Sequence, residues 1–469
     1  MTPYETDFGV QGCFLLKHCK KQPYRIASDE SIFHLAINTN MLLRFGVSNF
    51  RSIKEYQEIS MVASAIKDAE ADLIDCHDFK LKVLPAAAIY GANAAGKSNF
   101  LRALRHMHTV IVNSHQKGKP GKPIPRAHFL LDSSCASTPT TLDCDFIFKG
   151  DRYHYGFIFN DERILEEWLF SFSGKMQRKI KKTLFHRKHD EDKEFYFGPD
   201  LKGLNKTVSE LTRDNSLLLS AAAANNHKQL LEIYQYFESN FEFTHSYRHV
   251  SPYELSKYLS DLDTRAKVVE FLQYADTGIV DVEVKRDDES DENAKDFRKG
   301  LSELISKFVG ESVPELINNE ADSVSFLLKH RGVDAENAAI NLADESDGTV
   351  ALLGILGPVF DVLKNGRILI LDELNTNLHP LVSRNLISIF NSKNTNQNGA
   401  QLIFTTHDTN LLCGGVMRRD QVWFAEKDQF GASHLYPLSD ISTRKSDNIS
   451  SGYLEGRFGA IPFMANWTL

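Results

Sequence analysis

The stretch "GANAAGKS", Gly91 to Ser98, constrains the fold of this 469-residue chain more than any other feature. It fits the pattern G-x-x-x-x-G-K-[ST], in which a glycine-rich backbone wraps phosphate groups and the lysine reaches the terminal phosphates. The apolar run 84–90 before it is typical of a short buried strand, and residues 98–113 after it are typical of an amphipathic helix. Phosphate binding requires this strand–loop–helix context, so the sequence predicts a P-loop in an α/β fold.

Two further motifs belong to the same chemistry. In "RILILDELNTNLHP" the apolar residues Ile368 to Leu371 predict a buried strand that ends in Asp372 and Glu373. An aspartate at such a strand tip can hold the Mg²⁺ shell, and the next carboxylate can polarise the attacking water. A third run, "LIFTTHDTNLL", ends at His407, whose neutral imidazole can contact the γ-phosphate or support that water. The three motifs together predict an ATPase site that uses ATP and Mg²⁺.

Composition narrows the class of protein. Lys and Arg number 54 against 62 Asp and Glu, so the net charge of −8 argues against a protein that coats nucleic acid non-specifically. The six cysteines form no Cys-x-x-Cys pair, which fits a reducing compartment without a zinc site. No apolar run approaches the roughly 20 residues that a membrane span needs, and the start lacks the order of a signal peptide. We therefore expect a cytoplasmic protein that does not enter a membrane.

The order of motifs divides the chain into four expected segments. Residues 1–40 show no clear period and are expected to be an N-terminal extension, and Met41 opens an alternating strand. The other expected segments are an N-terminal lobe of an ATPase head with the P-loop and a β-meander (41–200), a mainly helical insertion that acts as a lid or arm (201–335), and a C-terminal lobe with the remaining motifs (336–469).

This set of motifs resembles the ABC-type ATPase head shared by the SMC, RecF and OLD proteins. The closer resemblance is to the AAA-family ABC-type ATPases of the RloA/abortive-infection group, and it covers nearly all of the chain from Met41 to Leu469. It is carried by "NFRSI", "GANAAGKSN", "ESDGT", "LDELNTNLHP", "TTHD" and "YLEGRFGAIPF". The implied fold is α/β: an ABC-type head, which is a P-loop NTPase with a mixed sheet plus a β-meander, and a largely helical insertion between the Walker A and Walker B motifs. In such heads two ATP molecules are sandwiched between two protomers, so a homodimer or higher homo-oligomer is implied.

The resemblance also implies residue roles. The ATP-binding phosphate loop would comprise Gly91, Asn93, Gly96, Lys97, Ser98 and Asn99. The Mg²⁺ ligands would be Ser98 and Asp372, the catalytic base Glu373, the switch histidine His407, and the loop that crosses the dimer interface Asn375 to Asn377. The metal-bridging glutamine of the family stays unassigned, since the nearest candidate is Gln116 in a loop.

The stretch "ESDGT" has two interpretations. Ser346 or Asp347 can cap the apolar helix that follows, because either side chain can accept from free N–H groups of the first turn. The stretch also stands shortly before Asp372, where an ABC head has its signature loop. By that resemblance Ser346, Asp347, Gly348 and Thr349 would address the γ-phosphate held by the opposite protomer. We favour both roles at once, although the aspartate departs from the double glycine of transporters.

Spacing excludes some relatives. The insertion lacks the sustained heptads of long coiled-coil arms. The short remainder after His407 leaves no room for the nuclease domain of OLD proteins, so any nuclease activity is expected on a partner chain. The acids within 281–292 are expected to form a solvated loop. The basic run 175–188 is either a phosphate-backbone grip or one side of an exposed hairpin, so nucleic-acid binding stays open.

Three functions remain. The resemblance favours an ATP-driven oligomeric switch in anti-phage defence that acts through a separate effector, such as a nuclease. The alternatives are a RecF-like DNA repair or recombination ATPase that binds duplex DNA and a scaffold that binds ATP but scarcely hydrolyses it. Glu373 argues against the scaffold because a complete base is present.

Overall fold

The computed structural model describes residues 40–173, 180–245, 252–286, 324–332, 338–413, 415–444 and 447–461. Several sequence expectations lie outside these residues. They are the extension 1–40 apart from its last residue, the first residues of the basic run (175–179), the second half of the charged stretch 281–292 (287–292), and the end of the tail motif.

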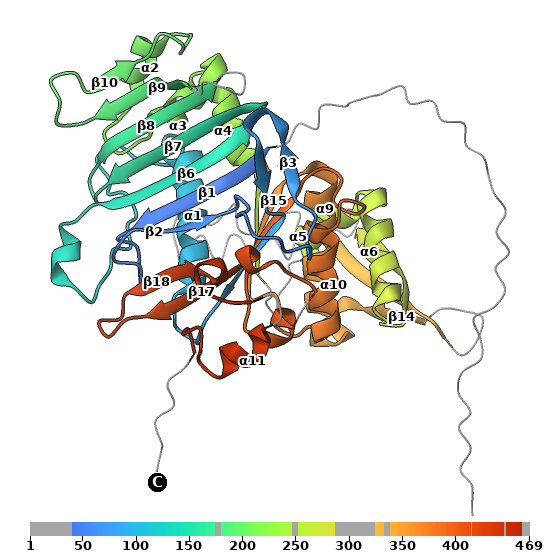
Figure 1. Cartoon of the computed structure of the whole chain (residues 1–469). Helices are drawn as coiled ribbons and strands as arrows, with labels where there is room; N and C mark the ends of the chain where they lie inside the picture. The colour runs from blue at the N-terminus through green and yellow to red at the C-terminus, as the bar shows by residue number, and fades with distance from the viewer. Residues whose placement is uncertain are drawn as a thin grey trace, which may run out of the picture. The chain divides into compact units, whose positions relative to one another are not determined.

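A six-stranded sheet carries the motifs (Figure 1). In the order of the sheet its strands are β11 (Phe241–His245), β15 (Ile368–Asp372), β16 (Gln401–Thr405), β5 (Ala86–Tyr90), β17 (Val422–Lys427) and β18 (Ser433–Pro437). The first five strands run parallel and β18 is antiparallel to β17. Because parallel strands end at one edge, the sheet brings the ends of β5, β15 and β16 together. Those ends carry the three predicted motifs.

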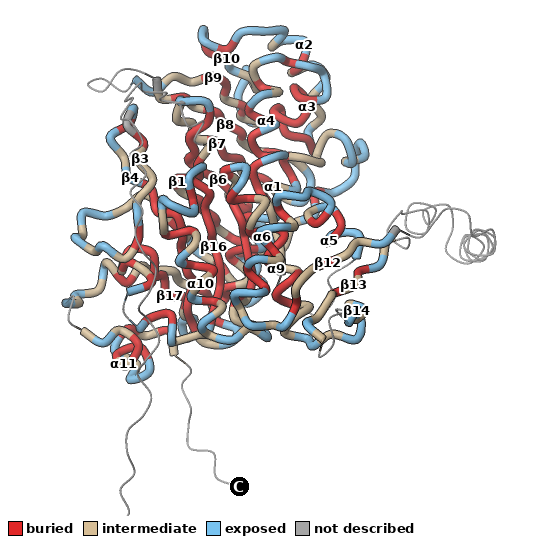
Figure 2. Tube along the Cα trace, turned by 90° about the vertical axis from the view of Figure 1, so that its right-hand side faces the viewer, coloured by how far each residue is buried: buried red, intermediate tan, exposed pale blue. Residues whose placement is uncertain are grey.

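Successive residues of this sheet face different helices, as the strand period of two requires. In β5, Ala87 and Ile89 join the hydrophobic core that includes α1 (Lys97–Asn113), whereas Ala88 and Tyr90 join a second core. The second core includes α9 (Asp347–Asn365) and α10 (Pro380–Asn391). Both faces are therefore covered, and Figure 2 shows the interior strands almost wholly buried. This is why each motif strand reads as a continuous apolar run.

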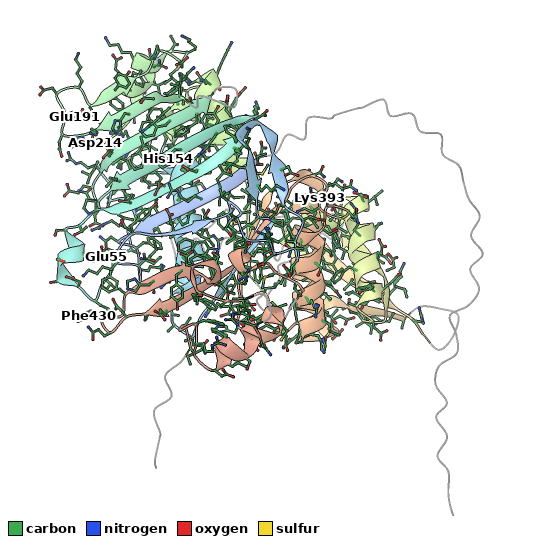
Figure 3. The ribbon with its side chains drawn as sticks, in the orientation of Figure 1. Glu55, His154, Glu191, Asp214, Lys393 and Phe430 are labelled. Carbon is green, nitrogen blue, oxygen red and sulfur yellow. The ribbon has the colours of Figure 1, made fainter. Side chains whose placement is uncertain are left out.

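A second, antiparallel sheet forms the expected β-meander. In the order of the sheet its strands are β10 (Phe195–Phe197), β9 (Ile180–Lys188), β8 (Ile164–Ser173), β7 (Asp151–Phe159), β6 (Thr140–Phe148), β1 (Met41–Ser48) and β2 (Gln57–Ser60). One face packs on helices: Tyr155 of β7 contacts Phe237 of α4 (Lys228–Asn240). The neighbouring His154 points to the other face, where it stacks on Trp168 and Phe170 (Figure 3). The structure confirms the expected class, an α/β ATPase head with a mixed sheet and a meander.

The expected helical insertion, residues 201–335, is more divided than the sequence indicated. Its described part contains α2 (Asn205–Leu211), α3 (Leu218–Ala224), α4, α5 (Pro252–Leu259) and α6 (Leu262–Tyr274). It also contains strands: β11 pairs in parallel with β15 and so belongs to the ATPase sheet itself. Residues of α3 and α4 share the core of α1 and the meander. Apolar side chains of residues 201–245 therefore pack in the core of the head, and the division of the chain into segments, with a mainly helical lid or arm over 201–335, stays a prediction.

A small antiparallel sheet follows, made of β12 (Ile279–Arg286), β13 (Val324–His330) and β14 (Ala338–Asn341). Its apolar residues, among them Val282 and Leu328, belong to the same core as α5, α6 and α9. The 3₁₀ turn Leu342–Asp344 leads from β14 into α9. The acids Asp281 and Glu283, expected in a solvated loop, lie on β12 and pair with Lys329.

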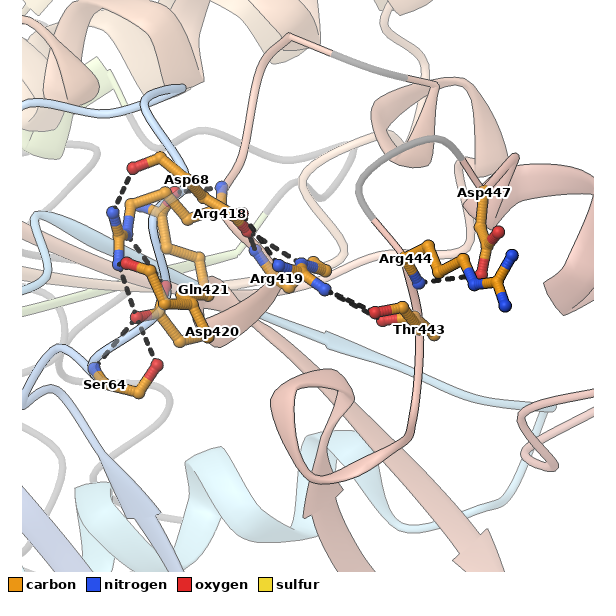
Figure 4. A network of polar contacts seen from close by, with 10 residues as sticks. Ser64, Asp68, Arg418, Arg419, Asp420, Gln421, Thr443, Arg444 and Asp447 are labelled. Atoms are coloured by element: carbon orange, nitrogen blue, oxygen red, sulfur yellow. Dashed lines mark hydrogen bonds and ion pairs between the residues drawn. The ribbon is translucent and has the colours of Figure 1, made fainter.

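A buried ion-pair network fixes the segment that precedes β17 (Figure 4). The guanidinium of Arg418 donates to Asp420 at 2.8 and 2.9 Å, and Asp420 accepts from the amide and hydroxyl of Ser64. Arg419 forms two hydrogen bonds of 3.0 Å to Asp68. These bonds satisfy charges that would be costly to bury alone. The remaining described elements are β3 (Ile74–Cys76), β4 (Leu81–Val83), α11 (Ile449–Leu454) and the short 3₁₀ turns His77–Phe79, Ser133–Ala136, Thr409–Leu412, Arg419–Gln421 and Leu438–Asp440.

Candidate active site at the ends of the parallel strands

The phosphate loop is a tight turn between β5 and α1. Gly96 stands at the N-cap of α1 with a φ of 109°, where a side chain would be strained. A Cβ at Gly96 would lie 2.1 Å from Ser433 Oγ, and a Cβ at Gly91 would lie 2.2 Å from the carbonyl oxygen of Ala425. Both glycines are therefore required by close packing against β17 and β18. The loop presents backbone N–H groups at a helix N-terminus, which is the arrangement that binds phosphate.

Lys97 points back over this loop. Its ammonium donates to the carbonyl oxygens of Gly91 at 2.8 Å and Ala92 at 2.9 Å. Burial lowers the pKa of Lys97 to about 8, although the carboxylates of Glu373 and Asp372 favour its charged form. Among the described residues Lys97 forms no ion pair, and its hydrogen bonds go to neutral carbonyl groups. A cation placed in this way can bind the terminal phosphates without breaking a salt bridge.

The carboxylate of Asp372 lies at the centre of the site. Its Oδ1 accepts hydrogen bonds from Ser98 Oγ at 2.9 Å and from Thr405 Oγ1 at 2.6 Å. Asp372 is 3% exposed. The structure thus joins the two residues expected to ligate Mg²⁺, one from the start of α1 and one from the end of β15. A serine hydroxyl and an aspartate provide the oxygen ligands that Mg²⁺ prefers.

Glu373 adopts a strained backbone. Its φ is 59°, in the left-handed region that few residues other than glycine and asparagine enter. Two hydrogen bonds hold this turn: the Glu373 amide donates to Thr405 Oγ1 at 2.7 Å, and the Leu374 amide donates to the Thr405 carbonyl at 3.0 Å. The hydroxyl of Thr376 donates to Glu373 Oε2 at 3.1 Å. Strain held so firmly is typical of functional positions, and it fixes the carboxylate just beyond the strand tip.

The loop after Glu373 is tied to the loop that carries His407. Asn375 Oδ1 accepts from the hydroxyl of Thr406 at 2.9 Å and from the amide of His407 at 3.2 Å. Burial and the charge of Lys97 lower the pKa of His407, while the carboxylates of Glu373 and Asp372 oppose that shift. The imidazole is therefore kept neutral near pH 7, as a contact to phosphate or water requires.

Three hydroxyl residues of the site carried no predicted role. Thr405 links Asp372 to the Glu373 amide, as described above. Ser433 donates to the Ala95 carbonyl at 2.7 Å and lies 2.8 Å from Ser52 Oγ. Ser52 in turn accepts from Asn99 Nδ2 at 2.9 Å. The "NFRSI" turn therefore supports the phosphate loop through the hydrogen bonds of Ser52. The motif was visible in the sequence, but its contact with β18 was not.

The signature-loop residues lie apart from this cluster. Ser346 is the N-cap of α9: its Oγ accepts from the Thr349 amide at 3.1 Å and lies 2.9 Å from Thr349 Oγ1. Ser346 and Asp347 are both exposed. Among the described residues no hydrogen bond joins this loop to the phosphate loop, and Asp347 has no ion pair. A Cβ at Gly348 would lie 3.1 Å from the Asn377 carbonyl, so the loop instead adjoins the predicted interface loop.

These positions define the class of site. The described residues combine a phosphate-binding loop, a lysine, a serine–aspartate pair and a glutamate at the ends of parallel strands, which is the arrangement of a P-loop ATPase. Asn93, also expected to bind ATP, is exposed on the loop. No group of three or more His, Cys, Asp or Glu residues that could hold another metal occurs in the described part of the chain.

Comparison with known proteins agrees with this class. The family described as "AAA domain, putative AbiEii toxin, Type IV TA system" matches residues 86–413. The chain belongs to this family and carries an AAA-type ATPase domain. No curated protein sequence matches the chain.

Two SMC heads are among the solved structures that match the chain. The SMC head domain from Thermotoga maritima is 10% identical with a TM-score of 0.37, over 86% of this chain and 99% of that one. The Smc head with an extended coiled coil, bound to a ScpA domain derived from Pyrococcus furiosus, is 11% identical with a TM-score of 0.38, over 85% of this chain and 96% of that one.

In the described ranges, no helix has the length and apolar character to cross a bilayer.

Proposed function

We propose that this chain is an ATP-dependent dimerising switch in which each copy completes the ATP site of the other. In this proposal Gly91, Lys97 and Ser98 bind the phosphates on one protomer. Ser346 and the N-terminus of α9 address the γ-phosphate from the partner. ATP then serves as the bridge between two heads, and its hydrolysis separates them.

The observation that carries the proposal is the contrast between the two halves of the site. The phosphate loop, Asp372 and Glu373 are joined by hydrogen bonds, whereas Ser346 and Asp347 are exposed. A helix N-terminus attracts anions, and α9 is long enough for its dipole to act. Closure by a second copy would bring that exposed end to the phosphates.

Within one site the residues have separable roles. Lys97 binds the terminal phosphates, and Ser98 with Asp372 would hold a Mg²⁺ ion, which would neutralise charge on them. Glu373 orients water and accepts its proton, and Asn375 keeps His407 beside that water through the His407 amide. Because Thr376 already donates to Glu373 Oε2, the carboxylate is oriented before the site closes.

We further propose that the switch acts in anti-phage defence of the abortive-infection kind, in the cytoplasm, through a separate effector. The family description, a putative AbiEii toxin of a type IV toxin–antitoxin system, supports a defence role. In this proposal any nuclease chemistry belongs to the effector. Purification of the chain together with the product of its neighbouring gene tests this part.

Ser346→Arg tests the dimer site. The new guanidinium removes the cap and obstructs the approach of a second protomer, while the phosphate loop of the same chain is untouched. We expect ATP binding to persist and ATP-dependent dimerisation, measured by light scattering, to be lost together with hydrolysis. Thr207→Arg is the matched control, because Thr207 is exposed on α2, which packs on α3. Normal dimerisation by Ser346→Arg would refute the proposal.

A further inference from the structure

We infer that His330 is a positioning residue for the ATP site of the partner protomer, because it holds the carboxylate of Glu345 beside Ser346. The inference rests on the proposed function, since it concerns how the signature loop is presented to a second copy. In this inference the small sheet, β12–β14, fixes the position of the signature loop. His330 itself is not proposed to touch ATP.

The contact is short and specific. His330 Nε2 lies 2.5 Å from Glu345 Oε1, and the side chains are 21% and 7% exposed. A ring N–H that donates to a carboxylate forms a charge-assisted hydrogen bond, roughly twice as strong as a neutral one. Shielding from water strengthens it further. Surface ion pairs contribute little, but this pair is largely removed from solvent.

Glu345 needs a partner because of its place in the chain. It directly precedes Ser346, the cap of α9, and lies between two other acids, Asp344 and Asp347. Three carboxylates around a site for a triphosphate would repel it. Asp344 and Asp347 are exposed and solvated, whereas Glu345 is drawn toward the small sheet by His330. The helix N-terminus is thereby left to face an anion.

The backbone makes this contact a rigid connection. His330 ends β13, the central strand of the sheet, and pairs with Ile279 of β12 and Ala338 of β14. From β14 the chain passes through a single 3₁₀ turn, Leu342–Asp344, to Glu345. The sheet and α9 also share one hydrophobic core. A displacement of β13 would therefore move Glu345 and the cap of α9, and with them the surface offered to the partner.

The test uses the full chain and three variants. His330→Ala removes the donor, His330→Gln supplies an amide donor in its place, and Lys329→Ala is the matched control. Lys329 is the preceding residue of β13 and pairs with Asp281 and Glu283 on β12. ATP affinity, ATP-dependent dimerisation, steady-state hydrolysis and thermal unfolding are measured for each variant.

We expect His330→Ala to bind ATP as the wild type does, while its turnover number falls by about tenfold and dimer formation weakens, the scale expected for one lost charge-assisted bond. His330→Gln should recover most of that loss, and Lys329→Ala should match the wild type. If His330 served folding alone, His330→Ala would lower the unfolding temperature but would not reduce turnover while leaving ATP binding unchanged.

The outcomes separate this inference from the function on which it rests. If Ser346→Arg abolishes dimerisation but His330→Ala leaves turnover and dimerisation unchanged, the positioning role of His330 is wrong and the dimer site stands. A loss in His330→Ala that His330→Gln does not recover would equally overturn it, because any amide donor should hold Glu345. If Ser346→Arg still dimerises with ATP, the proposed function itself fails.

Discussion

The two halves of the proposed ATP site differ in how far they are organised within one chain. On the phosphate-loop side, Lys97, Asp372 and Thr405 are buried and hydrogen-bonded, and Glu373 is held in a strained turn. On the signature side, Ser346 is exposed, and its hydrogen bonds to described residues lie within the first turn of α9. Under the proposed function, one copy prepares the chemistry and a second copy supplies the other wall of the site. Such a division suits a switch that responds to assembly.

The largest expected effect concerns the organised half. Glu373→Gln keeps the size and the Thr376 contact but removes the base, so we expect hydrolysis to fall by about 100- to 10,000-fold. ATP binding should persist and the ATP-bound dimer should accumulate, as measured by light scattering and phosphate release. Glu232→Gln is the control, because Glu232 is an exposed glutamate on α4 that pairs with Lys149. Hydrolysis by Glu373→Gln at the wild-type rate would mean that another residue is the base.

The next effect is a pH dependence of ATP affinity, which arises from Lys97 in the phosphate-loop half of the site. Burial places the pKa of Lys97 at about 8, and phosphate binding favours its charged form. ATP affinity should therefore be constant below pH 8 and fall by about tenfold per pH unit above it, as far as the higher pKa of the bound state. Calorimetric titration from pH 7 to 9.5 measures this slope. Lys97→Arg stays charged throughout, so its affinity should not follow pH; an equal slope in both proteins would contradict the assignment.

The smallest of these effects tests the hydrogen bonds of the Thr405 hydroxyl in the phosphate-loop half of the site. Thr405→Val removes the hydroxyl that bonds Asp372 and the Glu373 amide, and it leaves buried polar atoms without their partner. We expect the free energy of unfolding to fall by about 1–3 kcal/mol. Hydrolysis should fall with it, since the Glu373 turn loses support.

The controls for Thr405→Val are a conservative and a remote change. Thr405→Ser keeps the hydroxyl and should restore hydrolysis. Thr109→Val removes an exposed hydroxyl on α1 that bonds the Arg105 carbonyl, so it should change stability little. A fully active and equally stable Thr405→Val would show that the strained turn is held in another way.

Much of the organised half could be predicted from sequence because its signals are local. Gly91 to Ser98 and Ile368 to Glu373 each contain a strand, a turn and the reactive groups in one short run, and parallel pairing then forces their ends together. The β-meander was predicted from apolar runs within 140–173 that are separated by the polar turns 149–152 and 160–163. What each loop does in the site was implied by resemblance rather than by spacing.

The parts that escaped prediction depend on long-range pairing. Nothing local shows that Phe241–His245 joins the ATPase sheet, since any short apolar run could be an edge strand. Likewise Ser52 meets Ser433, and His330 meets Glu345, only because separate strands bring them together. Hydroxyl and imidazole groups occur throughout the chain, and a single sequence does not say which of them find partners.

The most direct test of the central claim mixes two inactive variants. Lys97→Ala removes phosphate binding, and Ser346→Arg removes the surface offered to the partner, so neither protein alone should hydrolyse ATP. In a mixed dimer one site combines an intact phosphate loop with an intact signature loop. Our account predicts that mixing equal amounts restores hydrolysis, to at most about half of the wild-type rate, since only mixed pairs can close on ATP and each has one intact site of two. Activity in Ser346→Arg alone, or no recovery on mixing, would contradict the claim that each protomer completes the ATP site of the other.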